Sequence, residues 1–340
     1  MRITNKMVTA SYSRSLNILN RELNKLSEQV TTGRKFAKSS ENTAAAISAY
    51  QLRRNLKKTD DYMENIMHAK DFLTMTESTL TLVHESVQNA MDRVRAGLNA
   101  TSSSVERNIL AEELETIQEQ MLQTLNNNSI GIYCFGGSNT TSKPFEVDAN
   151  GFLTYNGYTL KDLDPADPAD ADLIKKLKSD GLTLDLGLGL TVNTGEIDPN
   201  SVFTYSIPGI EVMVSGVSDV NGESVPNNLY DLLGAIVKEL RKPDGEYDRE
   251  RLDSLFAKLE DNAGILLNNI TNVGAKTSYL DFMTERYEVL NINLKERQVH
   301  VESVDTALNI INFENHKVAY QAALRMGTKI IQQSIFDFLQ

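Results

Sequence analysis

The feature that most constrains this 340-residue chain is an apolar repeat near its C-terminal end. From Leu280 onward, an apolar residue returns every three or four positions over six heptads, with two polar exceptions and no proline. Its positions are Leu280, Met283, Tyr287, Leu290, Leu294, Arg297, Val301, Val304, Leu308, Ile311, Asn315, Val318 and Ala322. This spacing is typical of a long helix with one apolar seam, as in a coiled coil. Because one helix cannot bury such a seam alone, the repeat predicts a packing partner.

The phase of this repeat changes after Ala322, since Arg325 stands where the next apolar residue is expected. Apolar residues then continue in a shifted register, a change that resembles a coiled-coil stutter. The shifted set is Tyr320, Leu324, Gly327, Ile331, Ile335 and Phe338. We therefore expect one continuous helix from Leu280 to Gln340.

The N-terminal end carries a similar seam, followed by Gly33 as a left-handed helix stop. Two inner runs, residues 66–94 and 110–125, repeat the same spacing and predict an ordinary helical-bundle core. For the two outermost seams we expect packing between subunits. The residues predicted to make these subunit contacts are Leu16, Leu19, Leu23, Leu26, Val30, Ile311, Val318, Leu324, Ile331, Ile335 and Phe338.

Glycine and proline divide the chain into three parts. All seven prolines lie between Pro144 and Pro243, and fourteen of the nineteen glycines lie between Gly131 and Gly245. Flanks without proline suit long helices, whereas a turn-rich middle suits short strands. The predicted fold is mainly α with a β-rich insert. In it, both chain ends form a long antiparallel helical bundle or coiled coil, and the middle forms a strand-rich domain.

The predicted domains follow from this division. Residues 1–40 with 310–340 form the terminal assembly helices. Residues 41–160 with 245–309 form a helical core with a β-hairpin, and residues 161–244 form a variable β-rich outer domain. Within these domains, the spacing predicts helices over 44–98, 228–240 and 248–272, followed by the last helix. It predicts a hairpin of 145–147 with 152–155, strands over 182–192, 202–205 and 210–214, and an acidic loop over 164–172.

Bulk properties exclude several classes of function. The formal net charge of −12 argues against general binding of nucleic acid or anionic membranes. No run of 18 apolar residues exists, and the N-terminus lacks the pattern of a conventional secretory signal. The single cysteine, Cys134, cannot form an internal disulfide and is expected to be a small buried apolar residue.

No set of residues predicts catalysis, a cofactor or a metal. The histidines His68, His84, His300 and His316 lie in helical runs, and each pair is sixteen residues apart, far from ligand spacing. The acidic loop lacks the central glycine and the twelfth-position glutamate of a calcium loop. We therefore expect no enzyme, no cofactor and no metal site.

Several motifs resemble the bacterial flagellin family. They are the opening MRITNKM, Leu23-Asn-Lys-Leu26 with Thr32-Gly-Arg-Lys35, Gly274-Ala-Lys-Thr-Ser-Tyr-Leu280, Tyr320-Gln-Ala-Ala-Leu324 and the closing Gln333-Ser-Ile-Phe-Asp-Phe-Leu339. Within that family, the opening and the block from Gly131 to Gly157 are most similar to the hook-associated proteins. One departure is Ser40-Glu41-Asn42-Thr43, where the family usually has Ser-Asp-Asp/Asn-Pro. The resemblance therefore does not predict the conformation of this turn.

The resemblance implies a structural subunit of the bacterial flagellum, exported unfolded and located outside the cell at the hook–filament junction. It implies a ring of copies between a neighbouring hook-associated protein and flagellin, and a cytoplasmic export chaperone on the C-terminal helix. We expect the terminal segments to be disordered in the free subunit. Two narrow seams bury little apolar area, so their packing offsets little of the entropic cost of ordering the backbone.

Two alternatives stay open at this point. A flagellin of the filament itself would have a different closing sequence and a different first hairpin. A secreted coiled-coil adhesin or effector would need a large aromatic patch in residues 160–230, which the sequence lacks.

Overall fold

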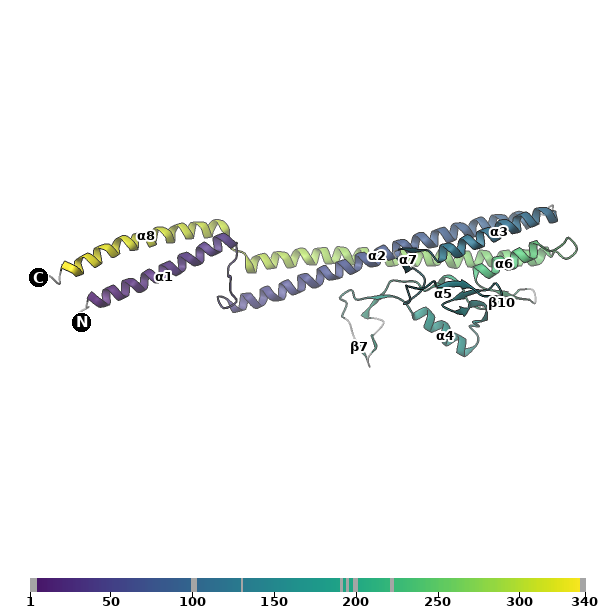
Figure 1. Cartoon of the computed structure of the whole chain (residues 1–340), viewed down its shortest axis with the longest axis horizontal. Helices are drawn as coiled ribbons and strands as arrows, with labels where there is room; N and C mark the ends of the chain where they lie inside the picture. Colours follow the sequence, from purple (N-terminus) through teal and green to yellow (C-terminus); the bar gives the residue numbers. More distant parts are fainter. Residues whose placement is uncertain are drawn as a thin grey trace. The chain divides into compact units, whose positions relative to one another are not determined.

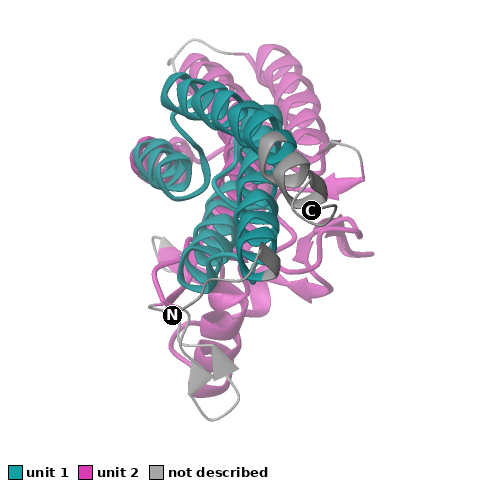
Figure 2. Cartoon of the chain, turned by 90° about the vertical axis from the view of Figure 1, so that its left-hand side faces the viewer, with its two compact units in different colours: residues 1–61, 287–340 teal, residues 62–286 magenta. Residues whose placement is uncertain are grey.

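The computed structural model describes residues 5–98, 103–129, 131–189, 192–193, 196–197, 201–220 and 223–336. The chain divides into two compact units (Figure 2): unit 1 comprises residues 1–61 and 287–340, and unit 2 comprises residues 62–286. Two long helices, α2 (Thr43–Leu98) and α7 (Arg249–Glu302), contribute residues to both units. The predicted fold class is confirmed, because long helices from both ends of the chain flank a small strand-containing middle region in the sequence.

The core of unit 2 lies along the predicted seam of α2. The seam members Ile66, Ala69, Leu73, Thr76, Leu80, Val83, Val87, Ala90 and Val94 are all at most 2% exposed. Ion pairs near the end of α2 connect it to its neighbouring helices. Arg93 pairs with Glu113 of α3 (Ser104–Leu125), and Arg95 lies 3.5 Å from Glu260 of α7. Burying each large side chain of such a seam contributes roughly 1.5–3 kcal/mol. The bundle-core prediction for this run is confirmed.

The predicted hairpin in unit 2 is confirmed and is anchored to a helix. Strands β3 (Phe145–Val147) and β4 (Leu153–Tyr155) pair antiparallel, with Phe145 opposite Tyr155, and β5 (Tyr158–Thr159) extends the sheet. The Asp148 carboxylate closes the turn by accepting from the backbone amides of Asn150 and Phe152, both at 2.8 Å. The buried Asp231 of α6 (Leu229–Leu240) accepts from the Leu153 amide at 2.9 Å, which fixes the hairpin on α6.

The remaining elements of unit 2 are short. Antiparallel pairs join β1 (Asn128–Ser129) with β2 (Ile132–Tyr133), β6 (Thr183–Leu184) with β9 (Phe203–Thr204), β7 (Val192–Asn193) with β8 (Glu196–Ile197), and β10 (Val217–Val220) with β11 (Glu223–Pro226). A 3-10 helix, η1, spans Leu160–Asp162. Among the described residues of the predicted strand 182–192, only β6 and Val192, the first residue of β7, are in strands. The predicted strand 202–205 is reduced to the two residues of β9.

Two local predictions in this middle region are wrong. Residues 210–214 are not a strand, since Gly209–Val212 form the short helix α5. Gly209 packs so closely on the hairpin that a Cβ there would lie 2.5 Å from the Phe145 ring. Half of the predicted acidic loop is instead the start of helix α4 (Pro168–Ser179), because Asp167 caps it and proline is favourable in the first turn.

In unit 1, α1 (Asn5–Thr32) and α8 (Thr306–Phe336) lie side by side and antiparallel (Figure 1). Gly33 ends α1 with φ +69°, as predicted. The expected continuous helix from Leu280 is wrong in two places. Its start is absorbed into α7, which runs through Gly274 without a turn, and α7 ends at Glu302. Asp305 then caps α8 by accepting from the Leu308 amide at 3.1 Å.

The predicted seam also leaves the buried face of α7. Leu280, Met283, Tyr287 and Leu294 are buried as expected, but Leu290 is 41% exposed. Asn291 takes the inward position and donates to Asp60 of α2 at 2.6 Å. A straight helix drifts relative to a strict seven-residue repeat, so the seam and the buried face separate.

Candidate assembly surface

On α1, the predicted apolar seam lies on the side that faces α8. Leu16, Leu19, Leu23, Leu26 and Val30 are all half-buried in the single chain. They follow one face of α1, and α8 is the helix packed against α1. The N-terminal seam is therefore covered within the chain, although only in part.

The α8 side of the pair mixes polar, small and aromatic residues. Asn309 and Gly327 are buried on it, and Phe313, His316, Tyr320 and Ala323 are half-buried. The Tyr12 hydroxyl donates to the carbonyl of Ala323 at 2.8 Å. The side-chain nitrogens Asn309 Nδ2 and His316 Nδ1 are buried without a hydrogen-bond partner. Buried unpaired polar atoms lower stability, so this face is a poor permanent interface.

The predicted apolar seam of α8 points away from α1 up to its change of phase. Its exposed fractions are 57% for Leu308, 57% for Ile311 and 62% for Val318, and Met326, which is not part of the predicted seam, is 61% exposed. We call these four residues the outward stripe. Leu324, at the edge of the α1-facing side, is 43% exposed. Contiguous exposed apolar residues of this kind mark interaction surfaces.

The other predicted contact residues cannot be placed on a face. Ile331 and Ile335 belong to α8, but their side chains are not among those that the structure describes. Phe338 lies outside the described residues. Sequence reasoning missed Tyr12, Asn309 and His316, whereas Gly327 belongs to the predicted shifted set and does meet α1. Only the small residues Ala323 and Gly327, four positions apart, hinted at a close helix contact.

The connector between α1 and α2 is tied to the break between α7 and α8. Arg34 and Ser303 form an antiparallel bridge, the Lys35 amide donates to the Glu302 carbonyl at 2.7 Å, and the Val304 amide donates to the Gly33 carbonyl at 3.0 Å. We call these backbone contacts the clasp. They replace the helical hydrogen bonds that are lost where α1 and α7 end.

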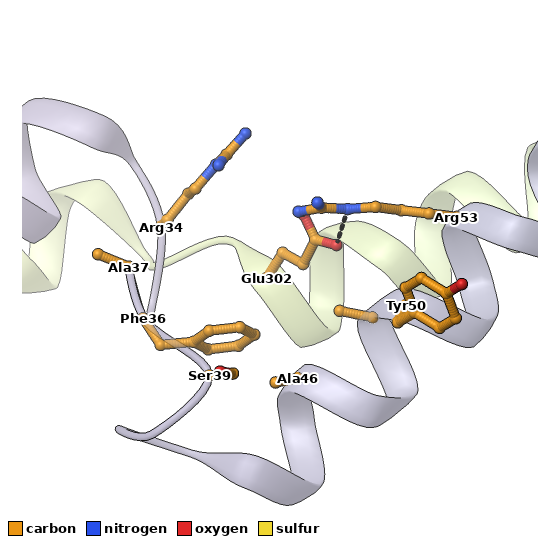
Figure 3. Close-up of a pocket in the computed structure, with 9 residues that line it drawn as sticks. Arg34, Phe36, Ala37, Ser39, Ala46, Tyr50, Arg53 and Glu302 are labelled. Atoms are coloured by element: carbon orange, nitrogen blue, oxygen red, sulfur yellow. Dashed lines mark hydrogen bonds and ion pairs between the residues drawn. The ribbon is translucent and has the colours of Figure 1, made fainter.

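A two-pronged ion pair reinforces the clasp. Arg53 of α2 donates from Nε and Nη2 to the two carboxylate oxygens of Glu302, at 2.8 and 2.7 Å (Figure 3). This hydrogen bonding holds the pKa of Glu302 below its ordinary value. Beside the pair lies a hollow of about 300 Å³, lined also by Arg34, Phe36 and Tyr50. The ion pair therefore links the start of α2 to the end of α7 beside the clasp.

The connector turn between α1 and α2 contains no proline. Asn42 caps α2 through a hydrogen bond from the Ala45 amide to its side-chain oxygen, at 3.0 Å. The Glu41 carboxylate accepts from the Ala37 amide at 3.2 Å. Side-chain acceptors therefore stabilise a turn that a proline would otherwise restrict.

Within the described part of the chain, no three His, Cys, Asp or Glu side chains gather as metal ligands. No described helix has the length and apolarity to cross a membrane. Cys134 is buried, as predicted, among the hydroxyl groups of Thr76 and Thr79, and burial raises the pKa of its thiol.

Comparison with known proteins agrees with this architecture. Residues 3–140 match the family described as "Bacterial flagellin N-terminal helical region". The flagellar hook-associated protein 3 of Escherichia coli (strain K12) is 22% identical over 344 residues, and that of Salmonella typhimurium (strain LT2) is 23% identical over 344 residues. Each comparison covers 99% of both chains. Xanthomonas campestris FlgL shares the fold, with a TM-score of 0.54 at 14% identity, covering 72% of this chain and 98% of that one.

The N-terminal part of the chain, residues 3–140, is therefore similar to the helical region of bacterial flagellins. The two relatives from Escherichia coli and Salmonella typhimurium, which the chain matches over nearly their whole length, are both named flagellar hook-associated protein 3.

Proposed function

We propose that the chain is a structural, non-enzymatic subunit of the bacterial flagellum at the hook–filament junction. Its full-length relatives are named flagellar hook-associated protein 3. The observation that carries the proposal is the outward stripe of α8, an apolar face left open in the single chain while a polar face meets α1. A subunit of a polymer needs such a face, whereas a self-contained monomer does not.

Assembly would proceed through the terminal helices. Burying Ile311, Val318 and Leu324 against neighbouring subunits would contribute roughly 1.5–3 kcal/mol each. Copies of the chain would form a ring, with a neighbouring hook-associated protein on one side and flagellin on the other. The proposed contact residues on α1, from Leu16 to Val30, are half-covered already and would be buried fully only in the ring.

The terminal segments, residues 1–40 and 310–340, would be ordered only on assembly. Ordering costs about 1–2 kcal/mol per residue in backbone entropy, and the α1–α8 interface offers few buried apolar side chains to offset it. Limited proteolysis of the purified chain tests this point. Rapid trimming of both ends down to a resistant core supports it, and ends as resistant as the core contradict it.

Export and location follow from the same proposal. The chain would leave the cell through the flagellar export apparatus and function outside it. In the cytoplasm, an export chaperone would cover the outward stripe of α8, because an exposed apolar face risks premature association.

The decisive experiment deletes the gene and restores it with variants. Deletion should leave hooks without filaments in electron micrographs, and the wild-type gene should restore filaments. Leu324→Asp should fold yet fail to restore them. The matched control is Gln321→Asp, an exposed polar position on the same helix, which should restore filaments. Normal filaments in the deletion strain would rule out the junction role.

A further inference from the structure

Charge is distributed unevenly between the two units. Unit 1 contains 17 Lys and Arg against 11 Asp and Glu, a net charge of +6, so unit 2 carries the remaining −18 of the total −12. The positive excess is concentrated in residues 34–58, where seven basic residues stand against Glu41 alone. Opposite charge on two parts of one chain favours contacts between copies, because the basic part of one attracts the acidic part of another.

The basic residues continue an exposed apolar stripe on α2. Ile47 is 57% exposed and Tyr50 is 69% exposed, and Arg54 and Lys58 follow at helical spacing on the same face. Other basic side chains nearby are engaged, since Lys57 pairs with Asp61 at 3.2 Å. Arg54 and Lys58 have no carboxylate partner in the part of the chain that the structure describes. We call Ile47, Tyr50, Arg54 and Lys58 the basic stripe.

Helix α3 presents the counterpart. Val105 is 67% exposed and Ile109 is 53% exposed, and Glu112 and Glu119 follow on the same exposed face. The intervening carboxylates Glu113 and Glu115 are paired with arginines within the unit. Among the described residues, by contrast, Glu112 and Glu119 have no basic partner. We call Val105, Ile109, Glu112 and Glu119 the acidic stripe.

The two stripes are opposite in charge, and they share the spacing from the first apolar residue to the first charged residue. Each begins with two apolar residues, and seven positions separate Ile47 from Arg54 and Val105 from Glu112. Two helices that lie parallel would therefore place apolar beside apolar and Arg54 beside Glu112. We propose that the basic stripe of one copy docks on the acidic stripe of a second copy. This inference rests on the proposed function only in that copies of the chain assemble.

Crosslinking between two variants that each carry one introduced cysteine, in a Cys134→Ala background, tests the contact directly. Purified Ile47→Cys chains are mixed with Val105→Cys chains at low salt and oxidised, and disulfide-linked dimers of the two variants are counted. A disulfide needs Cβ atoms about 3.5–4.5 Å apart, so only a true contact reacts quickly. The matched control replaces Val105→Cys by Val299→Cys, which is 58% exposed on α7. We expect crosslinking about tenfold faster than the control, as for about 1.4 kcal/mol of preferential association.

Charge reversal distinguishes specific docking from chance collision. Arg54→Glu in the Ile47→Cys chain should remove the tenfold advantage, and Glu112→Arg in the Val105→Cys chain should restore it. Raising the salt to about 0.5 M should weaken the wild-type reaction, because screening shortens the reach of charges. A rate equal to the control, or a rate unaffected by Arg54→Glu, overturns the inference. The proposed function fails separately, if filaments form in the deletion strain while the crosslink still appears.

Discussion

Gly327 of α8 lies directly against the ring of Tyr12 of α1: a Cβ added at Gly327 would stand 2.1 Å from the tyrosine oxygen. The same tyrosine donates its hydroxyl hydrogen bond to Ala323, one helical turn earlier. This contact limits how closely the two terminal helices approach, because the half-buried Tyr12 ring, held by its hydrogen bond, would have to shift to make room for a side chain at Gly327.

Gly327→Ala should therefore open the terminal pair, although alanine is the better helix former. The expected result, measured in the assembled protein where the terminal helices are ordered, is faster amide hydrogen exchange in α1 and α8, with the α2–α7 core unchanged. Gly274→Ala is the control, because Gly274 lies within α7 with no atom within 4 Å of an added Cβ. That change should raise the free energy of unfolding by about 1 kcal/mol. Equal exchange in the wild type and Gly327→Ala would contradict the close approach.

The Arg53–Glu302 pair should make the clasp sensitive to acid. Its hydrogen bond lowers the pKa of Glu302 in the folded chain, so the stabilisation is fully present above the unfolded pKa of about 4.3. It is then lost as the pH falls through the lower folded value. Arg53 is half-exposed, which limits the contribution to about 1 kcal/mol.

A double-mutant cycle of Arg53→Met and Glu302→Gln measures this contribution through the unfolding free energy at neutral pH and at pH 3. The coupling should be present at neutral pH and smaller at pH 3. A coupling that does not change with pH would show that the pair is not electrostatic. Lys57→Met, which breaks an exposed pair with Asp61, serves as a control with little effect.

Asp231 is expected to matter through its acceptor oxygens. Asp231→Ala leaves the Leu153 amide and the Asn228 side chain without their partner, and should lower the unfolding free energy by about 1–3 kcal/mol. Burial raises the pKa of Asp231, so Asp231→Asn, which keeps an acceptor and removes the buried charge, should cost much less. Chemical denaturation of both variants checks this. Equal losses would show that the charge, not the hydrogen bond, holds the hairpin.

Cys134 should not respond to redox conditions in the folded chain. Its thiol is buried and its pKa is raised by that burial, so the reactive thiolate is disfavoured. Thiol-labelling reagents should react only after denaturation, and neither a reductant nor a strong chelator should change the helical circular dichroism signal. Rapid labelling under native conditions, or loss of helix with the chelator, would contradict this.

Prediction from the sequence succeeds where one face of a helix is buried by the chain itself. The α2 seam from Ile66 to Val94 lies where its spacing places it, because neighbouring helices of the same unit cover it. The break after Glu302 could not be predicted, since residues 303–305 contain no glycine or proline. Partners distant in the sequence stabilise it, namely Gly33 and Lys35.

The predicted contacts between subunits stay a prediction, but the packing of the two seams within the chain can be compared with the sequence. The seam residues of α1 face α8, whereas the apolar seam of α8 up to Ala322 does not face α1. Spacing shows which residues share a face, but it does not show which neighbour occupies that face. Here Tyr12 and Gly327 select a different face of α8, and only the three-dimensional contact reveals that choice.

The clasp has a consequence for the order of folding. It joins residues about 270 positions apart, and closing so long a loop is entropically costly when it happens first. Pairing of α2 with α7, through Asp60 with Asn291 and Arg53 with Glu302, already brings those positions together. The terminal helices can then zip from Gly33 and Val304 toward the chain ends, each step closing only a small additional loop. The ends should be the last segments to fold and the first to fray.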